Sequence, residues 1–303
     1  MSRTLVMGIL NITPDSFADG GKYLSKTDAI TQGRRLIAEG ADIIDIGGES
    51  TRPGAERVSE EMELERVIPV VTELVKDGAV ISVDTMRAEV AKQGITAGAT
   101  YINDVSGGLA DEKMAKLIAS NSKVQYIAMH WRGHSKEMQK QAVYENVVTE
   151  VKDELDDRVT SLLKAGVSPE QIILDPGIGF AKSSAHNWEL LKNIDRLNLL
   201  GFPILVGASR KRFLGDLISA EVADDRVFFL FGDFNSFWIT HSGTSPDRKW
   251  RFRNLPIPAV LKIITSAMTG TLKGSTCFMN FANWSISKIG AVRKYPVPTF
   301  SIS

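Results

Sequence analysis

The sequence predicts an α/β protein, a (β/α)₈ barrel of the TIM type in which seven units are clear and the eighth is atypical or missing. Short β-rich runs alternate with amphipathic helical patterns over the first 220 residues, and such crossovers indicate parallel strands. A length of 303 residues fits one barrel of about 250 residues with an additional segment. A doubly wound sheet also fits the alternation, but the sequence has no Gly-x-Gly-x-x-Gly after the first strand and no Gly-Lys-Ser/Thr loop, which favours the barrel.

The seven units follow one another without a long gap. Apolar and β-branched residues predict strands at 5–12, 41–47, 80–84, 101–105, 124–129, 172–175 and 203–207. Helical periodicity predicts helices at 29–38, 60–76, 87–97, 112–119, 144–164 and 188–197. The second helix begins with Glu60 and Glu61 and ends with Lys76, charges that the helix dipole favours at these ends.

Charge divides the chain into two predicted parts, a barrel at 1–221 and an atypical segment at 222–303. The whole chain has no net formal charge, so we expect no nucleic-acid partner. However, the second part has a net charge of +6, balanced by −6 in the first, and it holds 13 of the 23 aromatic residues. We infer that the second part is not an ordinary continuation of the fold, as would result from a frameshift, a fusion or a substituted ending.

The cellular location is predicted from two further features. Cys277 is the single cysteine, so no internal disulfide can form, which fits a reducing cytoplasm. No uncharged apolar run reaches the roughly 18 residues of a membrane span, and no secretory signal is recognised at the amino terminus. We therefore expect a cytoplasmic protein without a membrane partner.

Polar residues follow almost every predicted strand. In a barrel these carboxyl ends converge on one mouth, where active sites of this fold lie. One such residue alone would be a helix cap or a turn residue, but a set at successive strands indicates a binding site. Carboxylates and amides there can bind a flat heterocycle rich in donors, and cations can bind an anion. The set comprises Asn11, 49–52, Asp84, 103–104, His130, Asp175 and 209–212.

Three longer motifs resemble those of the dihydropteroate synthases, a family of pterin-binding enzymes. They are GILNITPDSFADGG at 8–21, DIGGESTRPG at 45–54 and LDPGIGF at 174–180. The shorter motifs SVDT at 82–85, INDV at 102–105 and SRKRFLG at 209–215 stand between and after them in the order of the family. The resemblance covers residues 3–220 and implies a transferase of folate biosynthesis that joins 6-hydroxymethyl-7,8-dihydropterin diphosphate to p-aminobenzoate and releases pyrophosphate.

The resemblance also implies roles for individual residues. The pterin pocket corresponds to Asp84, Asn103, Asp175 and Lys211. Asn11 corresponds to a residue associated with Mg²⁺, the expected cofactor. Thr51 and Arg52 correspond to residues near the diphosphate and the benzoate. The side for p-aminobenzoate, where sulfonamides bind in the family, includes Phe17, Pro53 and Arg212, and Phe180 and Ser209 complete the expected substrate contacts.

The expected mechanism follows from the residues near these motifs. They include no Ser-His-Asp or Cys-His set, so we expect the leaving group to depart before the aniline nitrogen attacks. Asp19, Lys211 and Arg52 are the expected catalytic residues, with Asp19 on a first loop that Gly20 allows to move; Asp19 as a simple turn residue is the alternative. We interpret His130 as a pocket-wall or packing residue rather than a base.

The segment after residue 222 departs from the family pattern. The family has an Arg-x-His motif on the eighth strand that binds the diphosphate, whereas His241 here follows Ile239 and Thr240. One alternative is therefore a pterin-binding barrel with little or no activity. Another is a methyltetrahydrofolate-dependent methyltransferase barrel, which the motifs at 209–211 and 51–53 disfavour. Family members are homodimers, so the same is expected here if the segment permits it.

Overall fold

The computed structural model describes the greater part of the barrel. Its described residues are 4–12, 26–50, 57–134, 137–209, 211 and 213–214, with the backbone alone at 228–229, 237–241 and 264–265. The chain divides into two units, residues 1–267 and 268–303, and every described residue belongs to the first. The predicted boundary at residue 222 stays a prediction.

Eight parallel strands form a closed barrel, which confirms the predicted fold class. In order around the barrel they are β1 (Leu5–Asn11), β2 (Ile43–Gly47), β3 (Ile81–Asp84), β4 (Tyr101–Asp104), β5 (Gln125–Met129), β6 (Ile172–Asp175), β7 (Ile204–Val206) and β9 (Phe237–His241). The first seven lie within two residues of their predicted bounds. Short apolar and β-branched runs therefore located each of these strands correctly.

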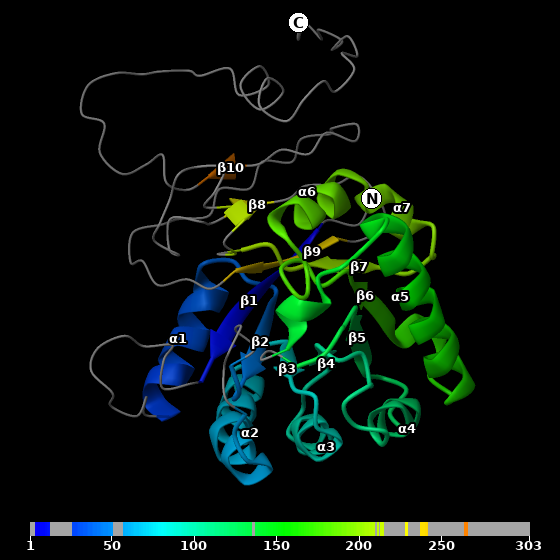
Figure 1. Ribbon diagram of the computed structural model, residues 1–303. Helices are drawn as coiled ribbons and strands as arrows, with labels where there is room; N and C mark the ends of the chain where they lie inside the picture. Colours follow the sequence, from blue (N-terminus) through cyan, green and yellow to red (C-terminus); the bar gives the residue numbers. More distant parts are fainter. Residues whose placement is uncertain are drawn as a thin grey trace, which may run out of the picture. The chain divides into compact units, whose positions relative to one another are not determined.

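Helices cover the outside of the strands (Figure 1). They are α1 (Lys26–Ala38), α2 (Glu60–Lys76), α3 (Ala88–Thr96), α4 (Met114–Ala119), α5 (Val147–Lys164), α6 (Ser184–Lys192) and α7 (Ile194–Asn198), with short 3₁₀ turns at Met138–Gln141 and Pro169–Gln171. The single helix predicted at 188–197 is two helices. Ser183 caps α6 by accepting a hydrogen bond from the His186 backbone at 3.2 Å, and Asn193 ends it by donating to the Glu189 carbonyl at 2.8 Å.

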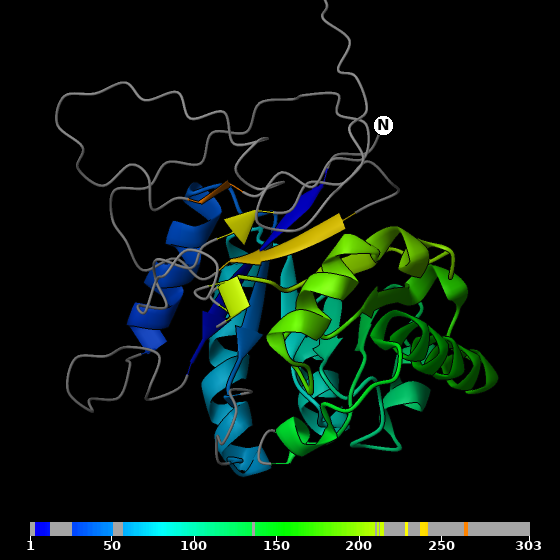
Figure 2. The ribbon, with the colours of Figure 1, turned by 45° about the horizontal axis from the view of Figure 1, so that its top comes forward.

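The eighth position of the barrel is filled from the segment that the sequence marks as atypical. β9 pairs in parallel with β7 on one side and with β1 on the other, where Leu5 lies opposite Trp238. Figure 2 shows β9 beside the blue strand β1. A separate antiparallel pair is formed by β8 (Phe228–Phe229) and β10 (Ile264–Thr265). The eighth strand is thus present, although it comes from an atypical sequence.

The strands bury two different faces. Their outward side chains pack against the helices in the main core, where Ile46, Val83 and Leu174 are fully buried. Their inward side chains form a second apolar group, here called the inner cluster, which consists of Met7, Ile43, Ile127, Ile173 and Leu205. Both faces are apolar because helices cover one and neighbouring strands enclose the other.

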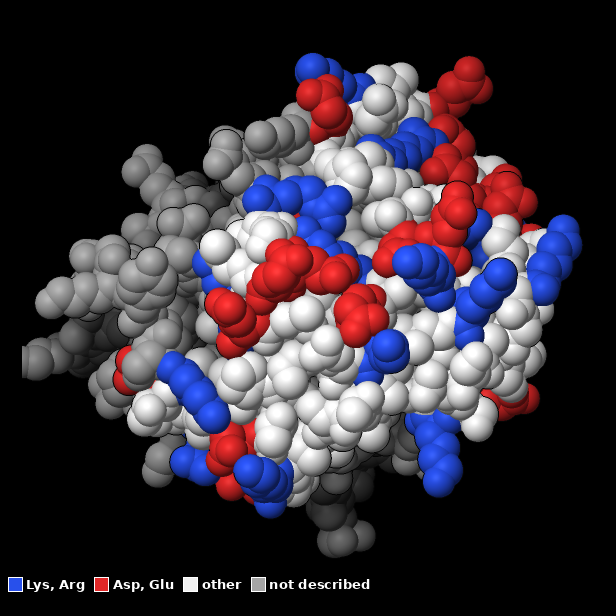
Figure 3. Space-filling view, turned by 90° about the horizontal axis from the view of Figure 1, so that it is seen from below, with Lys and Arg blue, Asp and Glu red and all other residues white. Residues whose placement is uncertain are grey.

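The outer surface is charged but not of one sign. On the face shown in Figure 3, Lys and Arg side chains lie beside Asp and Glu side chains. One exposed pair joins α1 to the end of α2, with Arg34 Nε 2.8 Å from Asp77 Oδ2. Within the described part of the chain, no helix combines the length and the apolar character that crossing a membrane requires.

Candidate active site

Polar side chains occupy the barrel interior on four strands, three of them at or next to the carboxyl end of the strand. Asp45 follows Ile43 of the inner cluster by two residues, and Asp175 follows Ile173 in the same way, so each pair shares the inward face of its strand. Strand register places Gly47 opposite Asp84, and Asp84 opposite Asn103. These four polar residues, Asp45, Asp84, Asn103 and Asp175, are called the polar layer below.

Asp45 and Asn103 hold each other inside the barrel. The Asn103 Nδ2 group donates a hydrogen bond of 2.9 Å to Asp45 Oδ2, and both residues are buried. Burial raises the pKa of Asp45, and the nearby Asp175 carboxylate raises it further. The Asp45 carboxylate therefore fixes the orientation of the Asn103 amide.

Asp84 has the least favourable surroundings for a negative charge. Burial raises its pKa well above the ordinary value, and the neighbouring carboxylates of Asp45 and Glu63 add to the effect. A ligand that donates hydrogen bonds from N–H groups to Asp84 would lower the free-energy cost of ionising this carboxyl group, because such bonds favour the charged form. The layer is thus suited to a ring rich in amino and N–H groups.

Asp175 faces the one cation of the predicted pterin pocket, Lys211. Its Oδ1 accepts a hydrogen bond of 2.7 Å from the Gly177 backbone. Burial raises the pKa of Asp175, and the Lys211 ammonium opposes that rise. Burial lowers the pKa of Lys211 to about 8, while its Nζ donates to the Ile178 carbonyl and lies 4.6 Å from the centre of the Phe180 ring. A lysine in this position can bind an anion or donate to a ring nitrogen.

A small hollow, partly open to solvent, lies at the same end of the barrel. Its wall is mixed, with Met86, Val105, Trp131 and Phe180 from loops that follow four successive strands, and with the polar residues Glu49, Ser50 and His134 beside them. Arg57 adds a cation at the edge. Apolar walls with a few polar groups are typical of sites for small planar molecules.

The loop after β2 is held at both ends by Arg87. The Glu49 carboxylate pairs with Arg87 Nη1 at 2.9 Å and accepts from the Val58 backbone at 3.2 Å. Arg87 Nη2 donates to the Val58 carbonyl at 2.6 Å, and Nη1 also pairs with the buried Glu63. The predicted residues Thr51, Arg52 and Pro53 belong to the segment between these anchors but lie outside the described residues.

The structure brings together the residues predicted to bind the pterin. Asp84, Asn103 and Asp175 are in the polar layer, and Lys211 and Phe180 lie at its edge. Ser209 follows β7, and its Oγ has no hydrogen-bond partner among the described residues. The remaining predicted contacts lie outside the described residues: Phe17, Asp19, Thr51, Arg52, Pro53 and Arg212. Their roles stay predictions.

Asn11 ends β1 beside the polar layer. Its Oδ1 lies 3.4 Å from the point where a Cβ on Gly47 would stand, and Asp84 Oδ2 lies 3.3 Å from the same point. The described residues hold no group of three or more His, Cys, Asp or Glu side chains that could bind a metal. Mg²⁺ commonly takes one or two protein oxygens together with water and substrate phosphates, so a single amide oxygen with a carboxylate nearby fits the predicted magnesium.

Two residues of this region were not predicted from the sequence. Asp45 lies within a quoted motif, and its position two residues after an inward isoleucine was a signal that could have identified it. Lys182 is 4 % exposed, and no sequence pattern indicated the burial of a lysine there. His130, interpreted from the sequence as a pocket-wall or packing residue, is buried, and burial lowers its pKa to about 4.

Comparison with known proteins agrees with this geometry. The family model described as "Pterin binding enzyme" matches residues 7–230. A dihydropteroate synthase of Mycobacterium leprae is 50 % identical over 215 residues, which are 71 % of this chain and 75 % of the relative. A structure of the Xanthomonas albilineans dihydropteroate synthase with 4-aminobenzoic acid is 43 % identical with a TM-score of 0.69, covering 74 % of this chain and 80 % of that one.

A second structure from Xanthomonas albilineans contains 7,8-dihydropteroate. It is 40 % identical, has a TM-score of 0.66, and the match covers 74 % of this chain and 79 % of that one. The family-model match at residues 7–230 includes all four residues of the polar layer. The chain belongs to the family of pterin-binding enzymes and, within it, to the dihydropteroate synthases.

Proposed function

We propose that the chain condenses 6-hydroxymethyl-7,8-dihydropterin diphosphate with p-aminobenzoate to give 7,8-dihydropteroate and pyrophosphate. The observation that carries this proposal is the polar layer, in which Asp84, Asn103 and Asp175 stand beside Lys211 in a barrel of the dihydropteroate synthase family. The Xanthomonas albilineans relative holds 7,8-dihydropteroate, which is the expected product here.

The polar layer would bind the pterin ring. Asp84 and Asp175 are acceptors for the amino and N–H groups of the ring, and donation from the ring would offset the burial that raises the pKa of both carboxylates. The Lys211 ammonium can donate to a ring nitrogen or carbonyl. The hydrogen bond to Asp45 orients the Asn103 amide before the substrate arrives.

The hollow would receive p-aminobenzoate above the pterin. Phe180 and Trp131 offer ring faces and edges, and Lys211 over Phe180 places a cation where the two substrates would meet. From the family resemblance we include Phe17, Thr51, Arg52, Pro53, Ser209 and Arg212 in this contact set. Sulfonamides, as p-aminobenzoate analogues, would compete for the same hollow.

The reaction exchanges one bond for another at the pterin methylene. The carbon–oxygen bond to the diphosphate breaks, the aniline nitrogen forms a carbon–nitrogen bond, and the proton lost from that nitrogen goes to solvent. His130 is not the base, because Glu154 and Lys182 occupy its two ring nitrogens. Lys211, Arg52 and Asp19 are the side chains proposed to stabilise the charges that develop. Mg²⁺ at Asn11 would supply positive charge next to the diphosphate.

A pterin-binding barrel with little or no activity is the second candidate. The specific observation in its favour is that the sequence has no Arg-x-His motif after residue 222, while the family match ends at residue 230. Loss of two groups that bind the diphosphate would weaken transition-state binding by several kcal/mol, as an order of magnitude. This candidate keeps the pterin site and loses turnover.

Assembly and location complete the proposal. From the family resemblance we infer a homodimer, and from the single cysteine a reducing cytoplasm. Sedimentation of the full chain at several concentrations would measure the assembly, and a monomer throughout would contradict the inferred dimer.

An assay of pyrophosphate release tests the central proposal. Full-length protein is supplied with both substrates and Mg²⁺, and binding of the pterin substrate is measured separately by calorimetry. Pyrophosphate release that requires p-aminobenzoate supports the synthase. Pterin binding without release favours the second candidate, and transfer of a methyl group from a methylated folate would contradict both.

A further inference from the structure

Lys182 is a buried amine that contacts no carboxylate within the described set of ion pairs. Its side chain lies inside the protein, where a lysine is rarely found without a partner. Its Nζ lies 3.0 Å from His130 Nδ1 and donates to the Phe180 carbonyl at 3.0 Å. Burial lowers the pKa of Lys182 to about 7, against the opposing effect of Asp175. These two contacts fix the position of the Lys182 amine, whose burial is unfavourable when it is charged.

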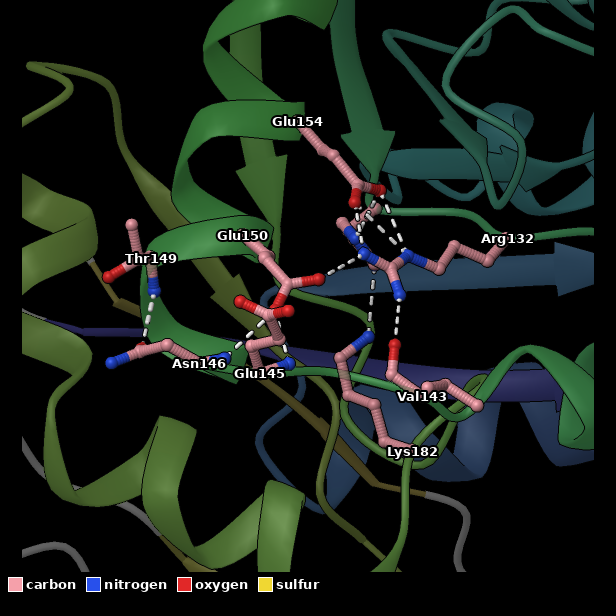
Figure 4. A network of polar contacts seen from close by, with 9 residues as sticks. Arg132, Val143, Glu145, Asn146, Thr149, Glu150, Glu154 and Lys182 are labelled. Carbon is pink, nitrogen blue, oxygen red and sulfur yellow. Dashed lines mark hydrogen bonds and ion pairs between the residues drawn. The ribbon is translucent and has the colours of Figure 1, made fainter.

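A chain of hydrogen bonds links Lys182 to the outer helix α5. His130 Nε2 lies 2.9 Å from Glu154 Oε2. A carboxylate can only accept here, so Nε2 carries the hydrogen and Nδ1 is the acceptor that the Lys182 amine requires. Glu154 is itself held by Arg132, and Figure 4 shows these two side chains meeting each other, with Lys182 below them. Although burial opposes it, hydrogen bonds from His130 and Arg132 lower the pKa of Glu154 to about 2.

Lys182 belongs to the loop between β6 and α6, and the backbone of this loop is under local constraint. Ala181, next to Lys182, has a φ of 47° and is buried, a backbone conformation that costs of order 1 kcal/mol for a residue other than glycine. Gly177 leaves no room for a Cβ, which would stand 2.6 Å from the His130 carbonyl oxygen. A strained loop pressed against the end of β5 keeps its shape only if surrounding contacts determine it.

The same loop carries the groups that meet Lys211. Its Phe180 ring lies beneath the Lys211 ammonium, and its Ile178 carbonyl accepts a hydrogen bond from the same group. Lys182 holds the Phe180 carbonyl. The position of the ring and of Lys211 thus depends on the contacts of Lys182.

We propose that Lys182, fixed by His130 and Glu154, is a positioning residue that sets the Phe180 ring and Lys211 for binding of p-aminobenzoate. The inference rests on the proposed function for the identity of this ligand. A purely structural lysine would affect only the folding of the loop. A positioning lysine affects the affinity for p-aminobenzoate in protein that is fully folded.

The first test replaces Lys182 with methionine, which keeps the unbranched shape and most of the length of the side chain and removes the amine. In Lys182→Met we expect the KM and the calorimetric Kd for p-aminobenzoate to rise about tenfold, since small misplacements of contact groups have effects of at least this order. Pterin affinity should change less than about twofold, because the polar layer is untouched. The matched control is Lys192→Met, which replaces a lysine whose side chain is 62 % exposed on α6 and should leave both values unchanged.

The second test changes Glu154, the member of the same hydrogen-bond network that lies nearest the surface. Glu154 lies on α5 with a side chain 39 % exposed, so Glu154→Gln should fold, and we expect a smaller rise in the same KM and Kd. In the double variant Lys182→Met with Glu154→Gln, the effects should not add, because both changes break one chain of hydrogen bonds. Lys182→Arg, which keeps a cation, should recover part of the affinity.

The outcomes separate this inference from the proposed function. Folded Lys182→Met with wild-type affinity for p-aminobenzoate overturns the inference, as do strictly additive effects in the double variant. If Lys182→Met does not fold, Glu154→Gln decides, and wild-type affinity in that variant overturns it. Wild-type protein that binds p-aminobenzoate without turnover contradicts the proposed function while the Kd values still decide the role of Lys182.

Discussion

The inner cluster and the polar layer lie on the same strands but have opposite chemistry. In β2 the chain passes from Ile43 to Asp45, and in β6 from Ile173 to Asp175, within two residues. The inner cluster is apolar and almost fully buried, whereas burial raises the pKa of every carboxylate in the polar layer. The comparison teaches that stability and binding are divided along the length of each strand.

The division has an energetic basis. Apolar side chains in the inner cluster gain free energy from burial at about 25 cal/mol per Å². Carboxylates in the polar layer are destabilised by burial and by each other until a ligand donates to them. Substitutions in the inner cluster and in the polar layer should therefore separate loss of stability from loss of turnover.

The largest effect is expected for Asp84→Asn in the polar layer. We expect turnover to fall by about 10³-fold, because the amide cannot replace a carboxylate as acceptor for two donors of the pterin. The free energy of unfolding should stay the same or increase, because a half-buried carboxylate with a raised pKa is removed. Steady-state kinetics and urea denaturation measure the two quantities. A variant that loses stability together with activity would contradict the division.

The opposite result is expected for Ile173→Ala in the inner cluster. Loss of a fully buried isoleucine side chain should lower the free energy of unfolding by about 2–5 kcal/mol. Turnover per folded molecule should remain within about twofold of wild type, since Asp175 keeps its backbone contact to Gly177. Denaturation curves and active-site titration at low temperature check this expectation. A large fall in kcat of the folded fraction would show that the inner cluster also contributes to turnover.

An intermediate effect is expected from pH, through His130. Burial, with help from the Lys182 ammonium, lowers the pKa of His130 to about 4 from an ordinary value of 6.5. Between pH 7 and pH 5 the histidine is protonated in the unfolded chain but stays neutral in the folded chain. The free energy of unfolding should therefore fall by roughly 2 kcal/mol over this range. His130→Gln should remove this part of the slope in pH-dependent denaturation. An unchanged slope would mean that His130 titrates normally.

The smallest effect is expected for a pair of matched glycines. Gly179 and Gly201 have φ values of 82° and 81°, but a Cβ on Gly179 would stand 2.7 Å from Lys211 Cδ, while one on Gly201 meets nothing within 4 Å. Alanine at either position should cost about 1 kcal/mol of stability. Only Gly179→Ala should displace Lys211 and lower kcat/KM, by about tenfold.

The two glycine variants control each other in the same assays. Thermal denaturation should give similar losses, and the kinetic difference should appear at Gly179 alone. Equal kinetics in both variants would contradict the account of Lys211 as a substrate contact.

Sequence alone predicted most of the barrel and half of its site. Short apolar runs located β1 to β7 because both faces of each strand are apolar. The strand ends identified Asp84, Asn103 and Asp175 because polar residues there interrupt those runs. Lys182 could not be predicted, since its burial depends on His130 and Glu154 from distant elements. The break between α6 and α7 was missed because it depends on local hydrogen bonds of Asn193, which donates to the Glu189 carbonyl. β9 was missed because its sequence departs from the family pattern.

The most direct test is a product analysis of the full-length chain beside the two layer variants. With both substrates and Mg²⁺, the account predicts 7,8-dihydropteroate and pyrophosphate in equal amounts from wild type and from folded Ile173→Ala, and almost none from Asp84→Asn. Wild-type protein that binds the pterin diphosphate and forms neither product would contradict the account.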